Sequence, residues 1–345
     1  MKEPHGGWHF FIFCLSPFAF CLPAAAGCAI VAVALSANPA AAQQWKPQKN
    51  VEIVVAAGAG GSADRGSRVA QKFLAALPDI PSVTVSNRQG GGGTLAWTFI
   101  AQHPGDPHYL GTLSPGLVTN EIVGTSPLSY RDFTPLNILM REYIVVSTRA
   151  ESPLNSAKDL IARMKKDPAS ISFGFASALG NQNHVVIGMM ARAAGVEPKA
   201  VKVVVFNSGS LAATAMLGGH VDVLVGTPGT VLPHINGGKA RALGISGPER
   251  QKGAYATVPT LREQGVDAVY YSWRGFLTTK GVTAPQIAFW EQAFARVVQE
   301  PEWKEDYEKN AWTEDFRNSA EARKHLDAES DFLRKILVEL GVLTR

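Results

Sequence analysis

Hydrophobic positions in this chain form short β-branched runs that alternate with amphipathic stretches. The first run, residues 51–56, ends at the glycine-rich segment Gly58–Ser62, and residues 63–77 after it carry apolar side chains at helical spacing. Ser62 stands where a helix N-cap is expected, and Asp64 falls in the predicted first turn, where the helix dipole favours a carboxylate. The predicted buried face of this helix comprises Val69, Ala70, Phe73, Leu74 and Leu77. The pattern therefore predicts a strand, a glycine turn and a helix.

The same scheme of strand, turn and helix recurs along the chain. Further strands are predicted over residues 83–86, 109–113, 171–175, 201–206, 221–225 and 240–245. Helices are predicted over residues 95–102, 157–166, 182–194, 285–299, 301–310 and 319–340, with a short one ending at Leu217 and Gly195 closing the third. Strands that alternate with helices are typical of parallel sheets in three-layer α/β lobes. No repeat or low-complexity linker interrupts them, so we expect two lobes joined by crossing strands.

The composition is that of an ordinary globular protein. The chain has 345 residues, of which 46% are hydrophobic and 18% charged, and this length accommodates two lobes of about 100–200 residues each. Its formal net charge is +4, from 33 basic and 29 acidic residues, without a block of five or more Lys or Arg. This charge is too weak and too dispersed to indicate nucleic acid as a partner.

The N-terminal segment differs from the rest of the chain. No charged residue occurs between Glu3 and Lys46, and residues 10–34 are dominated by apolar side chains. They lead into Ala40–Ala42, a small-residue pattern typical of signal-peptide cleavage sites. We therefore predict a secretory signal peptide over residues 1–42, cleaved at its end, and a periplasmic location for the mature protein.

Two alternatives to a cleaved signal stay open. The apolar stretch is longer than a usual signal core, so it is also compatible with an uncleaved membrane anchor. Cys28, in the sequence Ala-Ala-Gly-Cys, is compatible with lipid attachment, although the usual leucine three residues earlier is missing. The remaining cysteines, Cys14 and Cys21, lie in the same segment. The predicted mature protein therefore has no thiol for a disulfide, a nucleophile or a metal site.

The turns that follow the predicted strands share one composition. They are rich in Gly, Ser, Thr and Asn and precede predicted helices: Gly58–Ser62, Ser114–Gly116, Ser177–Asn183, Asn207–Ser210 and Thr227–Gly229. Parallel strands deliver such turns to the carboxyl edge of a sheet, where open α/β sheets bind ligands. Because helix N-termini present free N–H groups and a positive dipole end, several of them at one cleft predict a site for a carboxylate or phosphate.

One of these turns also fits a different function. Residues 58–63 match G-x-G-x-x-A after a strand and before a helix, which is the fingerprint of dinucleotide binding. The second predicted strand ends near Arg88, where no acid is present for a ribose hydroxyl, so a 2′-phosphate, as in NADP, would suit it better. Export argues against a nicotinamide cofactor. We therefore expect no cofactor, and an NADP-binding oxidoreductase stays as an alternative.

No catalytic constellation stands out in the sequence. The chain after residue 42 has no G-x-S-x-G elbow, no H-E-x-x-H and no histidines at metal-ligand spacing. His184 falls near the start of a helix, where it is compatible with a ligand contact or with a capping role. Asp222 stands at the start of a strand, far from the carboxyl edge, and we interpret it as structural. We therefore predict a binding protein rather than an enzyme.

A collinear series of segments resembles the substrate-binding proteins of tripartite tricarboxylate transporters, the Bug family. It begins with residues 54–65, Val-Val-Ala-Ala-Gly-Ala-Gly-Gly-Ser-Ala-Asp-Arg, and continues through Asn87-Arg88 with the Gly90–Gly93 run. The further matching segments are residues 110–116, 173–181, 215–222, 232–243, 258–265 and 272–276. Together they cover nearly all of the chain after the predicted leader, which makes the resemblance far more specific than the glycine turn alone.

This resemblance implies a Venus-flytrap fold of the type II periplasmic-binding-protein class, an α/β fold with parallel-rich sheets flanked by helices. It implies one lobe built from residues 43–142 and 268–345 and a second built from residues 143–267, with ligand held between them. The family delivers its ligand to a membrane permease of one large and one small subunit. We accordingly expect a small organic carboxylate and that permease as partners, and a monomeric receptor.

The resemblance also implies which residues grip a ligand carboxylate. By position these are Gly60, Gly61, Ser62 and Ser114 on one lobe and Gly180, Asn181 and Asn183 on the other. The first loop departs from the family because it lacks the prolines common there, so its shape and rigidity depend on other contacts.

Arg274 is a second departure, since many members have an apolar or aromatic residue there. The sequence Trp273-Arg274-Gly275 resembles the tricarboxylate-type branch. A guanidinium can bind a carboxylate through two parallel hydrogen bonds. We hypothesise that Arg274 takes a second carboxylate of a di- or tricarboxylate; the alternative is an ion pair at the surface or between the lobes.

The sequence leaves the ligand and the biological role partly open. Citrate-like, short dicarboxylic and aromatic carboxylic acids all fit, and Tyr143, Tyr271 and Trp273 either line an aromatic pocket or pack in the interior. A ligand-binding sensor subunit for a membrane signalling protein, or an exported enzyme on the same fold, would share this pattern of residues.

Overall fold

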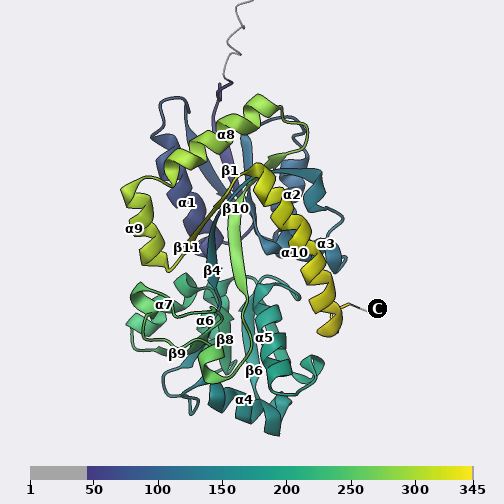
Figure 1. Ribbon diagram of the computed structural model, residues 1–345, viewed down its shortest axis with the longest axis vertical. Coiled ribbons are helices and arrows are strands. Elements are labelled where there is room, and N and C mark those ends of the chain that lie inside the picture. The colour runs from purple at the N-terminus through teal and green to yellow at the C-terminus, as the bar shows by residue number, and fades with distance from the viewer. Residues whose placement is uncertain (1–44, 344–345) are drawn as a thin grey trace, which may run out of the picture. The chain divides into compact units, whose positions relative to one another are not determined.

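Two β-sheets, one of six strands and one of five, organise residues 45–343, which the computed structural model describes (Figure 1). These residues form one compact unit. The predicted leader, residues 1–42, lies outside the described residues, and so do Cys14, Cys21 and Cys28. Within the described range, no helix is both long enough and apolar enough to span a lipid bilayer.

The first sheet has the strand order β11-β4-β10-β3-β1-β2. Its strands are β1 (Val51–Val55), β2 (Val83–Asn87), β3 (Tyr109–Leu113), β4 (Phe133–Tyr143), β10 (Tyr271–Thr279) and β11 (Thr313–Arg317). β1 pairs in parallel with β2 and β3, whereas β10 runs antiparallel to β3 and β4. Ile53 faces one side of β1 and Val54 faces the other, and both side chains are fully buried. Helices therefore cover both faces of this sheet.

These covering helices define lobe 1 together with the first sheet. Packed on the Ile53 face are α1 (Ser62–Ala75), α8 (Ala284–Val297) and α9 (Pro301–Asn310). Packed on the Val54 face are α2 (Thr94–Ala101), α3 (Pro115–Ile122) and α10 (Ser319–Glu339). The predicted apolar face of α1 meets this core, with Phe73 and Leu74 buried and Val69 partly buried against it.

The second sheet has the order β7-β6-β8-β5-β9 and, with its helices, defines lobe 2. Its strands are β5 (Val145–Arg149), β6 (Ser172–Ala176), β7 (Lys202–Phe206), β8 (Val223–Gly226) and β9 (Ala240–Ile245). One face carries α4 (Ala157–Lys166) and α5 (Gln182–Ala193), and the other carries α6 (Gly209–Leu217) and α7 (Pro228–Asn236). β6 lies parallel to β7 and β8, and β5 lies antiparallel to β8 and β9.

Two strands carry the chain between the lobes. β4 leads through Ile144 directly into β5, and β10 returns the chain to the first sheet at Tyr271. Figure 1 shows these neighbouring strands in the middle of the described chain, where β4 and β10 pair antiparallel. This is the crossing-strand arrangement expected of the fold class. The division of the chain at residues 142/143 and 267/268 stays a prediction.

The sheets are parallel where strands alternate with helices and antiparallel at β4, β5, β10 and β11. The hydrophobic pattern did not identify these four strands. A parallel pair needs a long crossover, usually a helix, and the chain has only Ile144 between β4 and β5. The helices expected after Ser114–Gly116 and Thr227–Gly229 are present as α3 and α7, but they begin within the predicted turns. Pro115 and Pro228 occupy first-turn positions that favour helix initiation.

The predicted N-cap of α1 is wrong by one residue. Gly61 takes the N-cap position and Ser62 is the first helical residue. The hydroxyl of Ser62 donates to Glu142 on β4 instead of capping the helix, because the carboxylate competes for the same hydroxyl. The predicted end of α5 is confirmed, since Gly195 follows the C-cap Ala194 with a left-handed φ of 68°.

Candidate functional site

A cavity of about 80 Å³ lies between the two lobes, at the carboxyl ends of their parallel strands. Four of the five predicted glycine turns contribute to its lining: Gly58–Ser62, Ser177–Asn183, Asn207–Ser210 and Thr227–Gly229. Arg274 reaches it from β10. A wider cavity of about 290 Å³ shares Ala57, Ser177 and Asn207 with the first and extends to Gly90–Gly93. Together these cavities form the interlobe cleft.

The residues predicted to bind ligand divide into two groups. Gly61, Ser62, Asn183 and Arg274 line the smaller cavity. The remaining four support the loops around it, as their hydrogen bonds and backbone geometry indicate: Gly60, Ser114, Gly180 and Asn181. The contact of either group with a ligand stays a prediction.

Asn181 and Gly180 show what this supporting role consists of. The Asn181 side chain accepts hydrogen bonds from the N–H groups of Asn183 and His184, at 3.0 and 3.2 Å, and so caps α5. The Gly180 N–H donates to His184 Nδ1 at 2.9 Å, with Gly180 in the left-handed region at φ 82°. His184 therefore holds the turn in place, and its ring also stacks on Phe175.

Four helices begin at the smaller cavity, namely α1, α5, α6 and α7. Asn181 caps α5, and Ser208 caps α6 by accepting from the Leu211 N–H. Within the described chain, neither Gly61 at α1 nor Thr227 at α7 provides such a side-chain cap. The first-turn N–H groups of α1 thus keep hydrogen-bonding capacity for an anion. In α7 this capacity lies in the Gly229 N–H, because Pro228 has no N–H and Thr230 donates to the Thr227 carbonyl.

Glu142 is a buried carboxylate beside this cavity that the sequence interpretation missed. Its side chain is fully buried, and Ser62 Oγ lies 2.8 Å from both of its oxygens. Arg274 Nη2 lies 3.2 Å from Glu142 Oε1, and the Arg274 side chain is 13% exposed. The sequence signal that could have identified Glu142 is a single acid beside the apolar run of β4, but that strand was not predicted.

Arg274 therefore lies at the cavity, as the hypothesis of a ligand contact requires, and it also forms an ion pair with Glu142. Its Nε is buried and has no hydrogen-bond partner among the described residues. The guanidinium thus combines the two roles weighed from the sequence: it is paired across strands within lobe 1, and it faces the cavity.

Asp64 takes over the stiffening that prolines would give the first loop. Its carboxylate accepts hydrogen bonds from the Gly60 N–H at 2.9 Å, from Arg68 Nε at 3.1 Å and from Asn87 Nδ2 at 2.9 Å. Burial by itself would raise the pKa of Asp64, but these donors outweigh it and hold the pKa below its usual value. The loop is therefore fixed from three directions.

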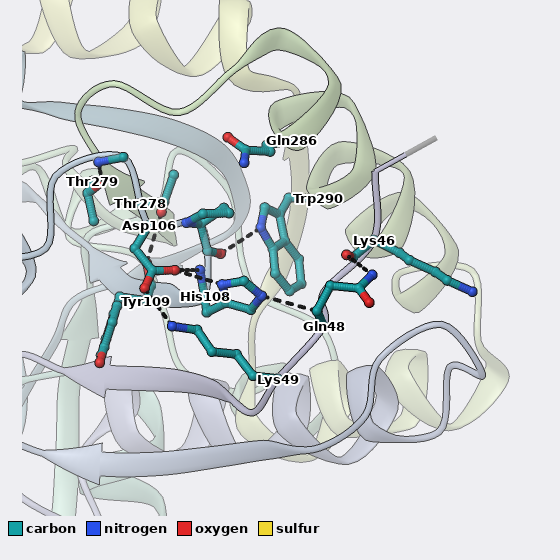
Figure 2. Close-up of polar contacts among 12 residues, drawn as sticks. Lys46, Gln48, Lys49, Asp106, His108, Tyr109, Thr278, Thr279, Gln286 and Trp290 are labelled. Atoms are coloured by element: carbon teal, nitrogen blue, oxygen red, sulfur yellow. Dashed lines mark hydrogen bonds and ion pairs between the residues drawn. The ribbon is translucent and has the colours of Figure 1, made fainter. Parts of the chain in front are cut away.

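A histidine–aspartate pair at the opposite edge of lobe 1 is structural (Figure 2). His108 Nδ1 lies 2.6 Å from Asp106 Oδ1, and His108 Nε2 accepts from the Gln48 N–H at 3.2 Å. Lys49 Nζ completes the group, 2.8 Å from Asp106 Oδ2. Both ring nitrogens are thus engaged, and the group attaches residues 46–49 to the start of β3. No group of three His, Cys, Asp or Glu within residues 45–343 is arranged to hold a metal ion.

Two further sequence interpretations are resolved by the structure. Arg88, considered for a 2′-phosphate, stacks on Phe99 at 3.5 Å and lies 3.8 Å from Glu52. Asp222 accepts from the Ser172 N–H and hydroxyl, at 2.9 and 2.7 Å, so its structural role is confirmed.

Two lobes joined by crossing strands, with helix N-termini gathered at the cleft between them, define the class of solute-binding proteins. The family described as the tripartite tricarboxylate transporter family receptor matches residues 68–342. The chain belongs to this family, whose members are receptors and not enzymes.

Relatives and solved structures agree with this assignment. The UPF0065 protein in the gbd 5′ region of Cupriavidus necator is 26% identical over 318 residues, which cover 91% of this chain and 94% of the relative. A Rhodopseudomonas palustris protein solved with adipate has a TM-score of 0.80 at 22% identity, covering 86% of this chain and 98% of that one. MatC of the same organism, solved with bound malate, has a TM-score of 0.74 at 21% identity, covering 84% and 99%. The shared fold is the type II periplasmic-binding-protein fold.

Proposed function

We propose that this protein captures a small organic carboxylate, with di- and tricarboxylates favoured, and delivers it to a tripartite permease of one large and one small subunit. The observation that carries the proposal is the convergence of α1 and α7, without side-chain caps, on a cavity that Arg274 also lines. Free N–H groups, positive dipole ends and a guanidinium all favour an anion. The malate and adipate bound by the two R. palustris proteins support the same ligand chemistry here.

The mechanism that follows is a hinged clamp. A carboxylate between α1 and α7 would contact both lobes, and those contacts exist together only when the lobes are close. The ligand therefore shifts the population towards the closed form by its preference for that form. The permease would then distinguish loaded from empty receptor by this shape.

Aromatic carboxylates fit the cleft less well than aliphatic ones. Trp273 is fully buried and packs against His325, and Tyr143 packs edge-on against Tyr271. The lining described for the smaller cavity includes none of the three predicted aromatic residues, Tyr143, Tyr271 and Trp273. We therefore favour a ligand recognised by charge and hydrogen bonding.

Export and a monomeric state complete the proposal. The predicted signal over residues 1–42 would deliver the receptor to the periplasm, where its permease can reach it. A sensor subunit for a signalling protein would use the same cleft, so binding alone does not separate the two roles. Co-purification of the loaded receptor with the permease pair supports transport, whereas retention by a membrane kinase or cyclase instead would contradict it.

A thermal-unfolding screen of residues 43–345 tests the ligand class. Malate, adipate, citrate, benzoate, hexanoate and NADP are each added at saturating concentration. At 100 times its dissociation constant, a ligand stabilises the folded state by about 2.7 kcal/mol, which raises the midpoint by a few degrees. We expect that increase with one aliphatic di- or tricarboxylate. An increase with NADP alone, or with no carboxylate, would contradict the proposal.

The variant Arg274→Ala, measured in the same screen, tests whether this side chain binds the second carboxylate of the ligand. A charge-assisted bidentate contact predicts a loss of about tenfold or more in affinity for the preferred di- or tricarboxylate. Hexanoate, with one carboxylate, should lose much less. Arg163→Ala, on the exposed side of α4, is the matched control for removing one positive charge. An unchanged affinity in Arg274→Ala would sink the assignment of a second carboxylate to this side chain.

A further inference from the structure

Arg65 is a cation in an electrostatically unfavourable position. It stands in the first turn of α1, where the positive end of the helix dipole disfavours a guanidinium. Its Nη1 donates to the Gly60 carbonyl. Its Nε and Nη2 are buried and have no hydrogen-bond partner among residues 45–343. Leaving buried donors of a charged group unpaired is costly, so this arrangement requires an explanation.

The Arg65 side chain reaches from lobe 1 to lobe 2. A methyl group placed on Gly229 would come within 2.4 Å of Arg65 Nη2, so the guanidinium lies directly against the first turn of α7. Ser62 on the same turn of α1 and Thr230 beside Gly229 both line the smaller cavity. Arg65 thus lies between the two helix N-termini that lack side-chain caps.

The charges around this point do not balance. Asp64 is paired with Arg68 at 3.1 Å, and Glu142 is paired with Arg274 at 3.2 Å. Burial lowers the pKa of Arg65 from its usual value, while the negative charges of Glu142 and Asp64 raise it. Arg65 and Arg274 therefore share one nearby carboxylate, that of Glu142, which is already paired with Arg274. One positive charge at the cleft remains to be compensated.

The size of the cavity indicates how a ligand could reach Arg65. Ligand cavities are commonly about 300–1,000 Å³, whereas the smaller cavity here is about 80 Å³. The adjoining wider cavity adds about 290 Å³ on the side of Gly90–Gly93, but Arg65 packs directly against Gly229. A ligand that reaches between α1 and α7 therefore requires a separation of these two helix starts. Because Arg65 belongs to α1 and Gly229 to α7, that separation uncovers Nε and Nη2 on the wall of the widened cleft.

We propose that Arg65 is the residue that makes the cleft selective for doubly charged over singly charged carboxylates. One carboxylate of the ligand binds at the first-turn N–H groups of α1 and at the Gly229 N–H of α7, and the other, which the proposed function places at Arg274, is also contacted by Arg65 through its free Nε and Nη2. Arg274 contacts the same carboxylate, but Glu142 already compensates its charge, so Arg65 supplies the net positive charge that the second carboxylate requires. The ligand chemistry rests on the proposed function, whereas the unpaired charge of Arg65 does not.

The test compares the mature protein with Arg65→Met, which keeps the apolar stem and removes the charge. Calorimetric affinities are measured for adipate and hexanoate, which have the same chain length and differ by one carboxylate. We expect Arg65→Met to lose about tenfold or more in adipate affinity and to keep its hexanoate affinity within about twofold. Arg65→Lys, which restores charge without the planar fork, should recover part of the loss. Arg163→Met is the charge-matched control.

A purely structural role for Arg65 predicts different results. The two affinities would then fall together or not at all, and Arg65→Met would lower the unfolding midpoint of the ligand-free protein. Removal of an uncompensated buried charge should instead leave that midpoint unchanged or raise it. Either of the structural results overturns the inference.

Binding of an inorganic dianion distinguishes failure of the proposed function from failure of the role of Arg65. If the wild type binds none of the carboxylates, the proposed function fails, and sodium sulfate at constant ionic strength then serves as the probe. A sulfate-dependent increase of the unfolding midpoint that Arg65→Met abolishes supports the role of Arg65. An equal increase in both proteins, or none in the wild type, overturns it.

Discussion

Some buried charges at the cleft are compensated within the protein and others are not. Glu142 is fully buried, accepts from Ser62 and neutralises Arg274, so part of the positive charge is used within the protein. Asp64 is used in the same way to hold the first loop. The groups whose positive charge is not compensated within the protein are therefore the first-turn N–H groups of α1, the Gly229 N–H of α7 and the guanidinium of Arg65, and we propose that they bind the ligand together with Arg274. Specificity at this scale depends on which charges are left uncompensated.

His184 gives a pH prediction at the residue scale. Burial lowers its pKa from 6.5 to about 4, so the folded state favours the neutral ring that accepts from Gly180. The stability from this preference is complete above pH 6.5 and is lost as pH falls towards 4, because the unfolded chain binds the proton first. His325, also lowered to about 4 by burial, adds to the same loss.

The measurement is the free energy of unfolding by denaturant between pH 7.5 and 4.5. The wild type should lose up to about 1.4 kcal/mol per pH unit for each such histidine over this window. His184→Asn keeps an acceptor for the Gly180 N–H and should show a shallower decline. His220→Asn, at a solvent-exposed position, is the control. Parallel curves for wild type and His184→Asn would show that His184 is not responsible.

Helix starts determine the chemistry of the cleft at the scale of elements. α5 and α6 begin with Asn181 and Ser208, which satisfy first-turn N–H groups with their own side chains. α1 and α7 begin without such caps and lie opposite each other, one in each lobe. The same glycine-rich composition therefore occurs at side-chain-capped helix starts, α5 and α6, and at uncapped ones, α1 and α7, which we propose as the anion sites.

Asn181→Ala tests this division of roles. Loss of the cap should reduce the free energy of unfolding by about 1 kcal/mol, with an additional contribution from the lost hydrogen bond to the Ala176 carbonyl. Asn181→Ser restores a capping oxygen and should recover most of the cap contribution. The measurement is denaturant unfolding of the ligand-free protein. If Asn181→Ala left stability unchanged and reduced only ligand affinity, Asn181 would be a ligand residue rather than a cap.

A hydrophobic core continuous between the lobes connects the whole described chain. One cluster of buried side chains includes Trp97 and Leu333 of lobe 1 together with Phe173 and Val186 of lobe 2. The end of α10 makes this connection: methyl groups on Gly180 and Gly188 would touch Leu337 and Leu340, respectively. An ion pair between Arg192 and Glu339 lies beside them.

We therefore expect the ligand-free protein to unfold in one cooperative transition. Scanning calorimetry should give a van't Hoff enthalpy close to the calorimetric one, and far-UV and tryptophan signals should coincide. Leu337→Ala, which empties a fully buried site at the junction, should lower the free energy of unfolding by about 2–5 kcal/mol without splitting the transition. Two separated transitions in the wild type would contradict a shared core.

Most of the fold follows from the sequence pattern, and the exceptions have a common physical origin. Helices and most parallel strands were predictable because period and capping are local: α4, α9 and β3 match their predicted bounds, as does the edge strand β9, which pairs antiparallel with β5. β4, β5, β10 and β11 were not predictable, because their antiparallel pairing depends on partners far away along the chain, such as Arg274 with Met140. The glycine turns, the family and the position of Arg274 at the cleft were all accessible from the sequence.

Tertiary structure decided the electrostatics of the cleft. The position of the Glu142 carboxylate decides three features of the cleft. It pairs with Arg274, it accepts from Ser62, which therefore does not cap a helix, and it sets how much negative charge lies near Arg65. Glu142 is brought there by β4, a strand that no local signal identified. The sequence by itself therefore determined the class of protein and the chemical type of its site. Which charges remain free for a ligand was set by the packing of α1, β4, β10 and α7, because compensation between buried charges depends on distance and solvent exclusion.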